Sequence, residues 1–113
     1  MTSLMKVTFG EYIRELRNLN GLTLTQLAAK LDLDSANLSK IENGKREFDE
    51  KRLLKLAKVF KLNIKKLRKE FISDQIAKQI YECDCTKEML VVAEEKAEYR
   101  RQLNNQYKKA KAI

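Results

Sequence analysis

The absence of proline is the feature that most limits how this 113-residue chain can fold. Proline breaks helices, and the chain has only three glycines at which a helix could otherwise be interrupted. Apolar residues recur with helical spacing in nearly every window, and Leu, Lys, Ala and Glu, which favour helices, are abundant. The sequence therefore predicts an all-α protein.

Five short helices are predicted between residues 8 and 72. A threonine followed three residues later by Glu or Gln forms a capping box at the start of each of the first two helices. Single Asp or Asn residues cap the next three. The predicted N-caps are Thr8, Thr23, Asp34, Asp49 and Asn63. The apolar face predicted for the fourth helix is Leu53, Leu54, Ala57 and Phe60.

A separate helical segment is predicted at residues 73–113. Ser73 can cap a further helix, residues 82–86 (ECDCT) interrupt the apolar pattern, and Thr86 can cap a long helix over 87–109. The predicted organisation is one five-helix domain followed by a C-terminal helical segment.

Positive charge is concentrated before this segment. Residues 1–72 carry 16 Lys and Arg against 9 Asp and Glu, residues 73–86 carry one against three, and residues 87–113 carry seven against four. The net charge of +8 and a pI near 9.5 favour a polyanionic partner. A lysine-rich, solvated surface is the alternative reading of the same numbers.

The second and third predicted helices fit a helix-turn-helix unit. Such a unit needs a small residue where its helices cross, which Ala28 supplies, and an apolar residue in its turn, which Leu33 supplies. The second helix should bury only its inner face, here Leu38 and Ile41, and present polar groups outward. The outer and flanking positions are Ser35, Ala36, Asn37, Ser39 and Lys40.

The stretch LTLTQLAAKLDLDSANLSKIENGKR resembles the helix-turn-helix of the XRE / phage-repressor family, which includes Cro-like and lambda-repressor-like proteins. The resemblance spans roughly residues 8–72. It implies a five-helix domain that binds double-stranded DNA, in a transcriptional regulator, with repression the favoured mode. It also implies a dimer on an inverted repeat, a recognition helix at 35–43, and neither catalysis nor a cofactor.

The resemblance implies roles for single residues. Ser35, Ala36 and Lys40 match base-facing positions, and Asn37 and Ser39 match positions that approach bases or phosphates. Positions that match contacts to the DNA backbone are Thr23, Thr25, Asn43, Lys45 and Arg46. Arg17 and Glu42 match a structural pair that ties the first helix to the recognition helix. Lys40 is the leading candidate, because an amine can reach both acceptors of guanine in the major groove.

Plainer readings of some of these residues remain. Lys45 and Arg46 can be ordinary surface charge, and Ser35 and Ser39 can be solvated polar residues. Two positions also depart from the family pattern. Asp32 stands where glycine is frequent, so we expect a positive φ there, which Asp tolerates better than most residues. Leu24 stands where a phosphate-binding glutamine is frequent, so we expect that contact to be missing.

The long last helix is the candidate for pairing, because one recognition helix covers only part of an operator. Met89, Val92, Tyr99 and Leu103 have heptad-like spacing, although Lys96 and Gln106 interrupt it. The helix can instead pack on the preceding helix or on the first domain. Sin-type repressors resemble this layout. An antitoxin whose last helix holds a toxin, or the controller of a restriction–modification operon, are alternative functions.

No enzyme or metal site is predicted. The chain has no histidine and no glycine-rich phosphate loop, and Cys83 with Cys85 supplies only half of a zinc site unless a dimer shares it. No apolar run is long enough to span a membrane and the first residues lack a secretory pattern, so we expect a cytoplasmic protein with both cysteines reduced.

Overall fold

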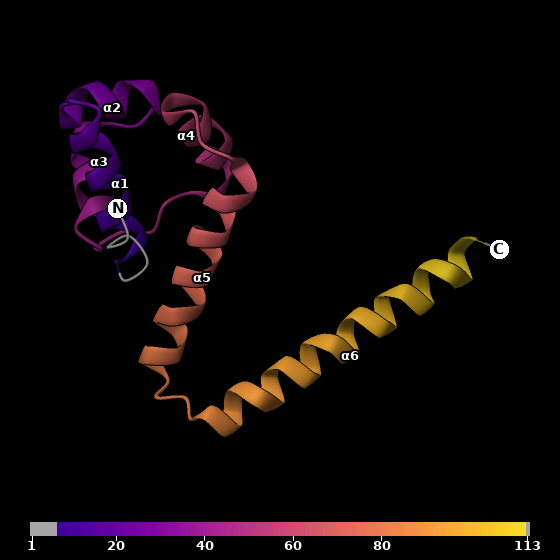
Figure 1. Cartoon of the computed structure of the whole chain (residues 1–113). Helices are drawn as coiled ribbons and strands as arrows, with labels where there is room; N and C mark the ends of the chain where they lie inside the picture. Colours follow the sequence, from indigo (N-terminus) through magenta and orange to yellow (C-terminus); the bar gives the residue numbers. More distant parts are fainter. Residues whose placement is uncertain (1–6, 113) are drawn as a thin grey trace. The chain divides into compact units, whose positions relative to one another are not determined.

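The computed structural model describes the backbone of residues 7–112 and the side chains of residues 7–109 (Figure 1). Within these residues the chain contains α-helices and one 3-10 helix, and no strand, which confirms the all-α prediction. The helices are α1 (Phe9–Leu19), α2 (Leu24–Lys30), α3 (Ser35–Glu42), η2 (Glu50–Arg52), α4 (Leu53–Phe60), α5 (Ile64–Glu82) and α6 (Lys87–Ala112). None of them combines the length and apolarity that crossing a lipid bilayer requires.

The predicted capping boxes are both present. Thr8 accepts a hydrogen bond from the Glu11 amide at 3.2 Å and Thr23 accepts one from the Gln26 amide at 3.1 Å, and in each box the later side chain bonds back to the threonine amide. Asn63 accepts from two amides in the first turn of α5. These bonds satisfy amides that have no partner inside the helix, so each helix starts where its cap stands.

One apolar core is shared by the four helices α1, α2, α3 and α4 and by the first half of α5. Its buried members are Phe9, Ile13, Leu27, Ala28, Leu31, Leu38, Ile41, Phe48, Leu53, Leu56, Ala57, Leu67 and Phe71. The rings of Phe9, Phe48 and Phe71 lie 5.2 to 6.4 Å apart between centroids, at tilted or edge-to-face angles. Aromatic pairs favour such angles, so Phe71 anchors α5 to α1 and to the loop before η2.

Gly10 marks the closest approach of α1 to α3. A Cβ atom built on Gly10 would lie 2.2 Å from the carbonyl oxygen of Ile41 and 3.0 Å from that of Glu42. No side chain fits in that space, so the crossing of α1 with the end of α3 requires glycine at this position.

The apolar face of α4 differs from the prediction at one residue. Leu54 is 54% exposed, whereas Leu56 is fully buried beside Leu53 and Ala57. The difference follows from helical geometry, because positions 53, 56, 57 and 60 share one face and position 54 points away from it. Asp49 caps the 3-10 turn η2, which leads directly into α4.

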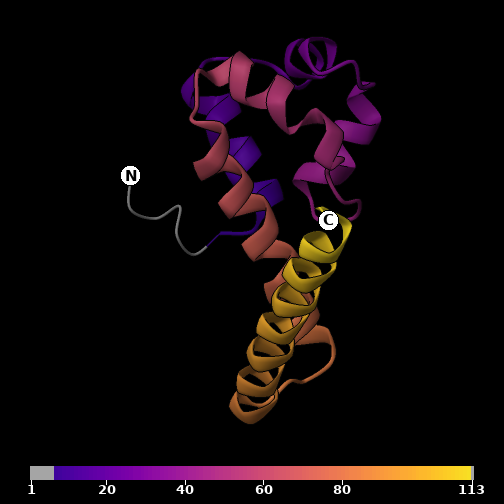
Figure 2. The same cartoon turned by 90° about the vertical axis from the view of Figure 1, so that its right-hand side faces the viewer.

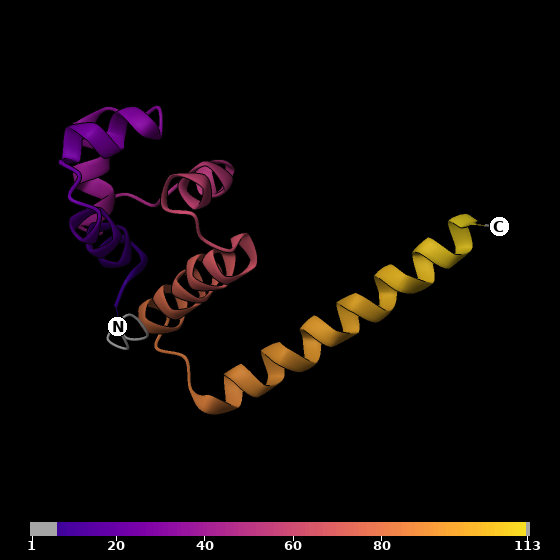
Figure 3. The same ribbon diagram turned by 45° about the horizontal axis from the view of Figure 1, so that its top comes forward.

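The predicted helix start at Ser73 is wrong. Figure 3 shows α5 running without a break from Ile64 to Glu82. Ser73 donates its hydroxyl proton to the Glu70 carbonyl oxygen at 3.2 Å, a bond that serine forms inside helices. Contacts divide the chain into a unit that ends at Ile76 and a unit that begins at Ala77, so the boundary falls inside α5.

Thr86 caps α6 as predicted, accepting a hydrogen bond from the Met89 amide at 3.2 Å. The helix is uninterrupted over Lys87–Ala112 and is seen foreshortened, in orange and yellow, in Figure 2.

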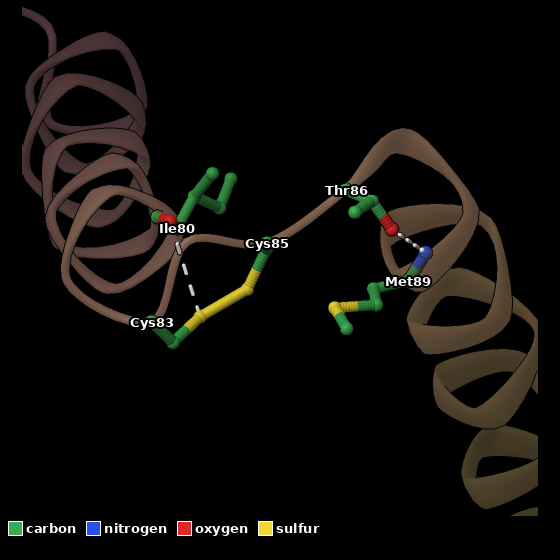
Figure 4. The surroundings of a disulfide bond; sticks show 5 residues. All are labelled: Ile80, Cys83, Cys85, Thr86 and Met89. Carbon is green, nitrogen blue, oxygen red and sulfur yellow. Dashed lines mark hydrogen bonds between the residues drawn. A yellow bond between two sulfur atoms is a disulfide. The ribbon is translucent and has the colours of Figure 1, made fainter.

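The expectation that both cysteines are thiols is wrong in this structure. Cys83 and Cys85 form a disulfide just before α6 (Figure 4). Asp84 between them has a φ of +53°, and this left-handed turn brings the two Cα atoms to 5.4 Å, a spacing that a disulfide spans.

Candidate nucleic-acid interface

Helix α3 packs on both α1 and α2, and its contacts leave one face outward. Leu38, Ile41 and Glu42 are buried, whereas Ala36 and Lys40 are exposed. Ser35, Asn37 and Ser39 are half-buried. The outward face of α3 is therefore narrow, with Ala36 and Lys40 at its centre, one helical turn apart.

A hydrogen-bond chain fixes the start of α3. The Asp34 carboxylate caps the helix by accepting from the Asn37 amide at 2.7 Å, and its second oxygen accepts from the Asn37 side chain at 3.0 Å. Arg46, which follows the helix, donates to the Asn37 side-chain oxygen at 2.9 Å. Asn37 is therefore bonded on both sides within the protein, and these bonds hold Arg46 beside the beginning of the helix.

The turn between α2 and α3 adopts the predicted strained conformation at Asp32, whose φ is +56°. Arg52 donates to the carbonyl oxygens of Leu31 and Asp32 at 3.0 and 3.3 Å. Lys55 forms an ion pair with the Asp32 carboxylate and donates a hydrogen bond to it, which lowers the pKa of that carboxyl below its usual value. Two cations outside the helix-turn-helix thus hold a turn that lacks the expected glycine.

Glu42 joins α3 to α1 through two arginines. Its side chain is 2% exposed, and Arg17 donates to both carboxylate oxygens, at 2.8 and 3.0 Å. This hydrogen bonding raises the pKa of the Arg17 guanidinium above its usual value. Arg14 adds a bond at 3.3 Å, and Arg17 also donates to the Leu22 carbonyl oxygen at 3.2 Å. The bidentate geometry is the strongest form of such a pair, so it fixes the position of α3 on α1.

Asn43 belongs to the same network. Its side-chain nitrogen donates to the Ser39 carbonyl oxygen at 2.9 Å, and its oxygen accepts from Arg14. The sequence predicted no role for Arg14 or for Gly10. The spacing of three between Arg14 and Arg17 on one helix is the signal that could have paired both with Glu42.

The candidate contacts to the DNA backbone lie at both ends of the helix-turn-helix formed by α2 and α3. Thr23 and Thr25 are exposed at the start of α2, where free amides can bind a phosphate. Lys45 and Arg46 are exposed after α3. Leu24 is half-buried and packs against the core. Its apolar side chain cannot donate a hydrogen bond to a phosphate. Within the described residues, no group of three or more His, Cys, Asp or Glu side chains is placed to hold a metal ion.

Two helices fixed at a tight turn, with the second presenting a polar face, define a helix-turn-helix DNA-binding protein. Residues 13–67 match the helix-turn-helix family, so this part of the chain is a helix-turn-helix domain of the XRE type found in DNA-binding regulators.

Three proteins of known sequence or structure are similar to parts of this chain. An uncharacterised HTH-type transcriptional regulator of Bacillus subtilis, RghRB, is 55% identical over 38 residues, which are 34% of this chain and 27% of RghRB, so the match spans about a quarter of that relative. The restriction–modification controller C.AhdI from Aeromonas hydrophila is 33% identical, with 59% of this chain and 98% of C.AhdI covered and a TM-score of 0.49. The clp gene regulator ClgR from Corynebacterium glutamicum is 24% identical, with 67% and 80% covered and a TM-score of 0.50, and shows the fold alone.

Proposed function

We propose that this protein is a dimeric, sequence-specific regulator of transcription, favoured as a repressor, that binds an inverted-repeat operator. The observation that carries the proposal is the outward face of α3, held in place by the Glu42 network. Residues up to about 72 bind DNA in this proposal, and the following segment pairs two copies. The paired recognition helices then read half-sites about 10 bp apart, one turn of DNA.

In this proposal Lys40 reads a base edge. It is exposed on the outward face, and a lysine amine that meets guanine contributes about 1–3 kcal/mol of discrimination, or roughly 5- to 150-fold in affinity. Ser35, Ala36 and Ser39 surround it as further base-contacting positions. Asn37, which approaches bases or phosphates, is held by Asp34 and Arg46.

Phosphate contacts position the domain. Thr23 and Thr25 bind from the start of α2, and Lys45 and Arg46 bind from the loop after α3. Asn43 acts from the end of α3, where Arg14 fixes its side chain. Such contacts carry no base information but make affinity fall steeply with salt concentration.

Selection of bound duplexes from a random pool tests sequence-specific DNA binding. We expect an enriched inverted repeat, and Lys40→Ala should lose preference at one base position in each half-site. The matched control is Lys58→Ala, which removes the same charge from an exposed position on α4. A selection without any enriched sequence would refute sequence-specific binding. Equal weakening on all sequences would instead restrict Lys40 to a phosphate contact.

The dimer contact is proposed on the stripe of Met89, Val92, Tyr99 and Leu103, all 45% exposed or more. Val92→Asp should convert the dimer to a monomer in sedimentation experiments. Val91→Asp is the control, since Val91 is even more exposed than Val92 but lies off the stripe. An equal loss of dimer in both variants, or in neither, contradicts the contact.

Two alternative functions keep the DNA-binding domain. The similarity to C.AhdI favours the controller of a restriction–modification operon. The uncovered apolar side chains of α6 favour an antitoxin that holds a toxin with this helix. A neighbouring restriction–modification operon would support the former, and a small stoichiometric partner that is recovered with the chain would support the latter.

A further inference from the structure

Helix α6 carries apolar side chains that nothing in its own unit covers. All its described side chains are exposed, although the helix is 26 residues long. Most of the stability of a helix in a protein comes from packing of an apolar face. The large apolar side chains exposed on α6 are Met89, Leu90, Val91, Val92, Tyr99, Leu103 and Tyr107. A partner surface would cover these side chains and stabilise α6.

Four of these residues, Met89, Val92, Tyr99 and Leu103, have the spacing expected of a helix that pairs with a single partner helix. Together with Lys96 and Gln106 they extend the stripe to positions 89, 92, 96, 99, 103 and 106, which alternate steps of three and four. Met89, Val92, Ala93 and Lys96 line one shared hollow at the beginning of α6. The stripe is mainly apolar, with Lys96 near its middle and Gln106 near its end.

The charges of α6 are divided between its two halves. Residues 87–98 carry two lysines against four glutamates, whereas residues 99–109 carry two arginines and two lysines without any acid. The first half is thus net negative and the second half net positive. Such a helix is electrostatically complementary to a second copy of itself that runs in the opposite direction.

We infer that α6 pairs antiparallel with α6 of a second copy, in the register that places Val92 opposite Leu103 of that copy. The inference rests on the dimer of the proposed function and adds the partner's orientation. In this register Lys96 faces Tyr99 of the second copy, where an ammonium can lie over an aromatic ring. Glu88 lies beside Lys109 of the second copy on the flank of the stripe.

Parallel pairing is less favourable for two reasons. It places Lys96 of one copy against Lys96 of the other inside the apolar stripe, and it aligns the negative halves with each other and the positive halves with each other. Its one gain is a flanking contact between Glu95 and Arg100 of the second copy. Exposed pairs of that kind contribute little, so they do not offset two like charges facing each other in the stripe.

Cysteine cross-linking of the full chain tests the orientation. In a background with Cys83→Ser and Cys85→Ser, the variants Val92→Cys and Leu103→Cys are purified separately and then mixed under mild oxidation. The mixture should form a cross-linked heterodimer. Each variant alone should not cross-link, because antiparallel copies hold two equivalent residues at these positions about 16 Å apart. Val91→Cys replaces Val92→Cys as the off-stripe control and should remain uncrosslinked.

Other results overturn the inference in distinguishable ways. Efficient cross-linking of each single variant alone would show parallel pairing, which refutes the orientation but leaves the dimer. Dimers in sedimentation without any cross-link would place the contact elsewhere. A monomer at all concentrations would refute the proposed dimer as well, and α6 would then bind a different protein or fold onto its own chain.

A charge exchange provides a second readout that does not need cysteines. Glu88→Lys should raise the dimer dissociation constant by on the order of tenfold, because the change occurs at two symmetric contacts. The double variant Glu88→Lys with Lys109→Glu should restore it. In a parallel pair the two residues lie about 31 Å apart, so failure of the second change to rescue the first contradicts the antiparallel register.

Discussion

Glu42 is the residue whose removal should most weaken the attachment of α3 to α1. Its side chain is 2% exposed, and that of its bidentate partner Arg17 is 16% exposed. Glu42→Ala leaves the Arg17 guanidinium largely buried, with the Leu22 carbonyl oxygen still accepting a hydrogen bond from it. Removing one partner of a buried pair costs about 3–5 kcal/mol, and the remaining exposure of Arg17 favours the lower end, about 3 kcal/mol.

This loss is large relative to the free energy of unfolding of the domain. A unit of this size has a free energy of unfolding of roughly 4–11 kcal/mol, and each kcal/mol shifts Tm by about 4–8 °C. We therefore expect Glu42→Ala to lower Tm by about 12–24 °C. Urea unfolding followed by circular dichroism at 222 nm gives the free energy directly, and specific DNA binding should weaken in parallel because α3 loses its support.

Arg14→Ala is the matched comparison. The Arg14 side chain is 40% exposed and its bond to Glu42 is longer, at 3.3 Å, so its removal should cost about 1 kcal/mol or less. The expected order of destabilisation is Glu42→Ala, then Arg17→Ala, then Arg14→Ala. A cost for Glu42→Ala no greater than that for Arg14→Ala would refute the reasoning that burial makes this pair strong.

Three further changes probe the rest of the domain. Gly10→Ala places a methyl group against the Ile41 carbonyl oxygen and should cost about 1–3 kcal/mol of unfolding free energy; an unchanged Tm would contradict the close crossing. Thr23→Ala removes the cap of α2 and should cost about 1 kcal/mol in urea unfolding, and no loss would mean that the cap is dispensable. Asp32→Asn keeps a residue that tolerates positive φ but removes the charge that Lys55 stabilises. Folding lowers the pKa of Asp32, so its charge stabilises the folded state at pH values above the unfolded pKa of about 3.9. This stabilisation is lost as the pH falls through the pKa of Asp32 in the folded protein. The Tm difference between variant and wild type should therefore shrink in acid, and a difference independent of pH would refute the charge contribution.

Local signals in the sequence were sufficient for several elements. The capping boxes at Thr8 and Thr23 depend only on residues three apart, so reading them needed no tertiary information. The positive φ at Asp32 was predicted from the family resemblance, because glycine is frequent at this position of the turn. The start at Ser73 was predicted wrongly because a serine can bond back to a carbonyl oxygen inside a helix as well as cap one, and the sequence pattern does not distinguish the two roles.

The candidate interface also combines features that the sequence predicts with features that it does not. The outward position of Lys40 follows from helical periodicity around Leu38 and Ile41, so the sequence alone located it. Arg46 donates a hydrogen bond to Asn37, and Arg14 donates one to Asn43. These pairs join residues up to 29 positions apart, and no local sequence pattern specifies them. Whether these asparagines also reach DNA stays a prediction.

The sequence by itself determined the all-α class, the position of the helix-turn-helix and the residue types on the outward face of α3, because these depend on periodicity and on caps within one turn. Tertiary structure decided the requirement for glycine at position 10 and the second arginine on Glu42, because both depend on how closely two separate helices approach, and that distance is set by the packing of the domain. The bond between Cys83 and Cys85 depends instead on the local left-handed turn at Asp84.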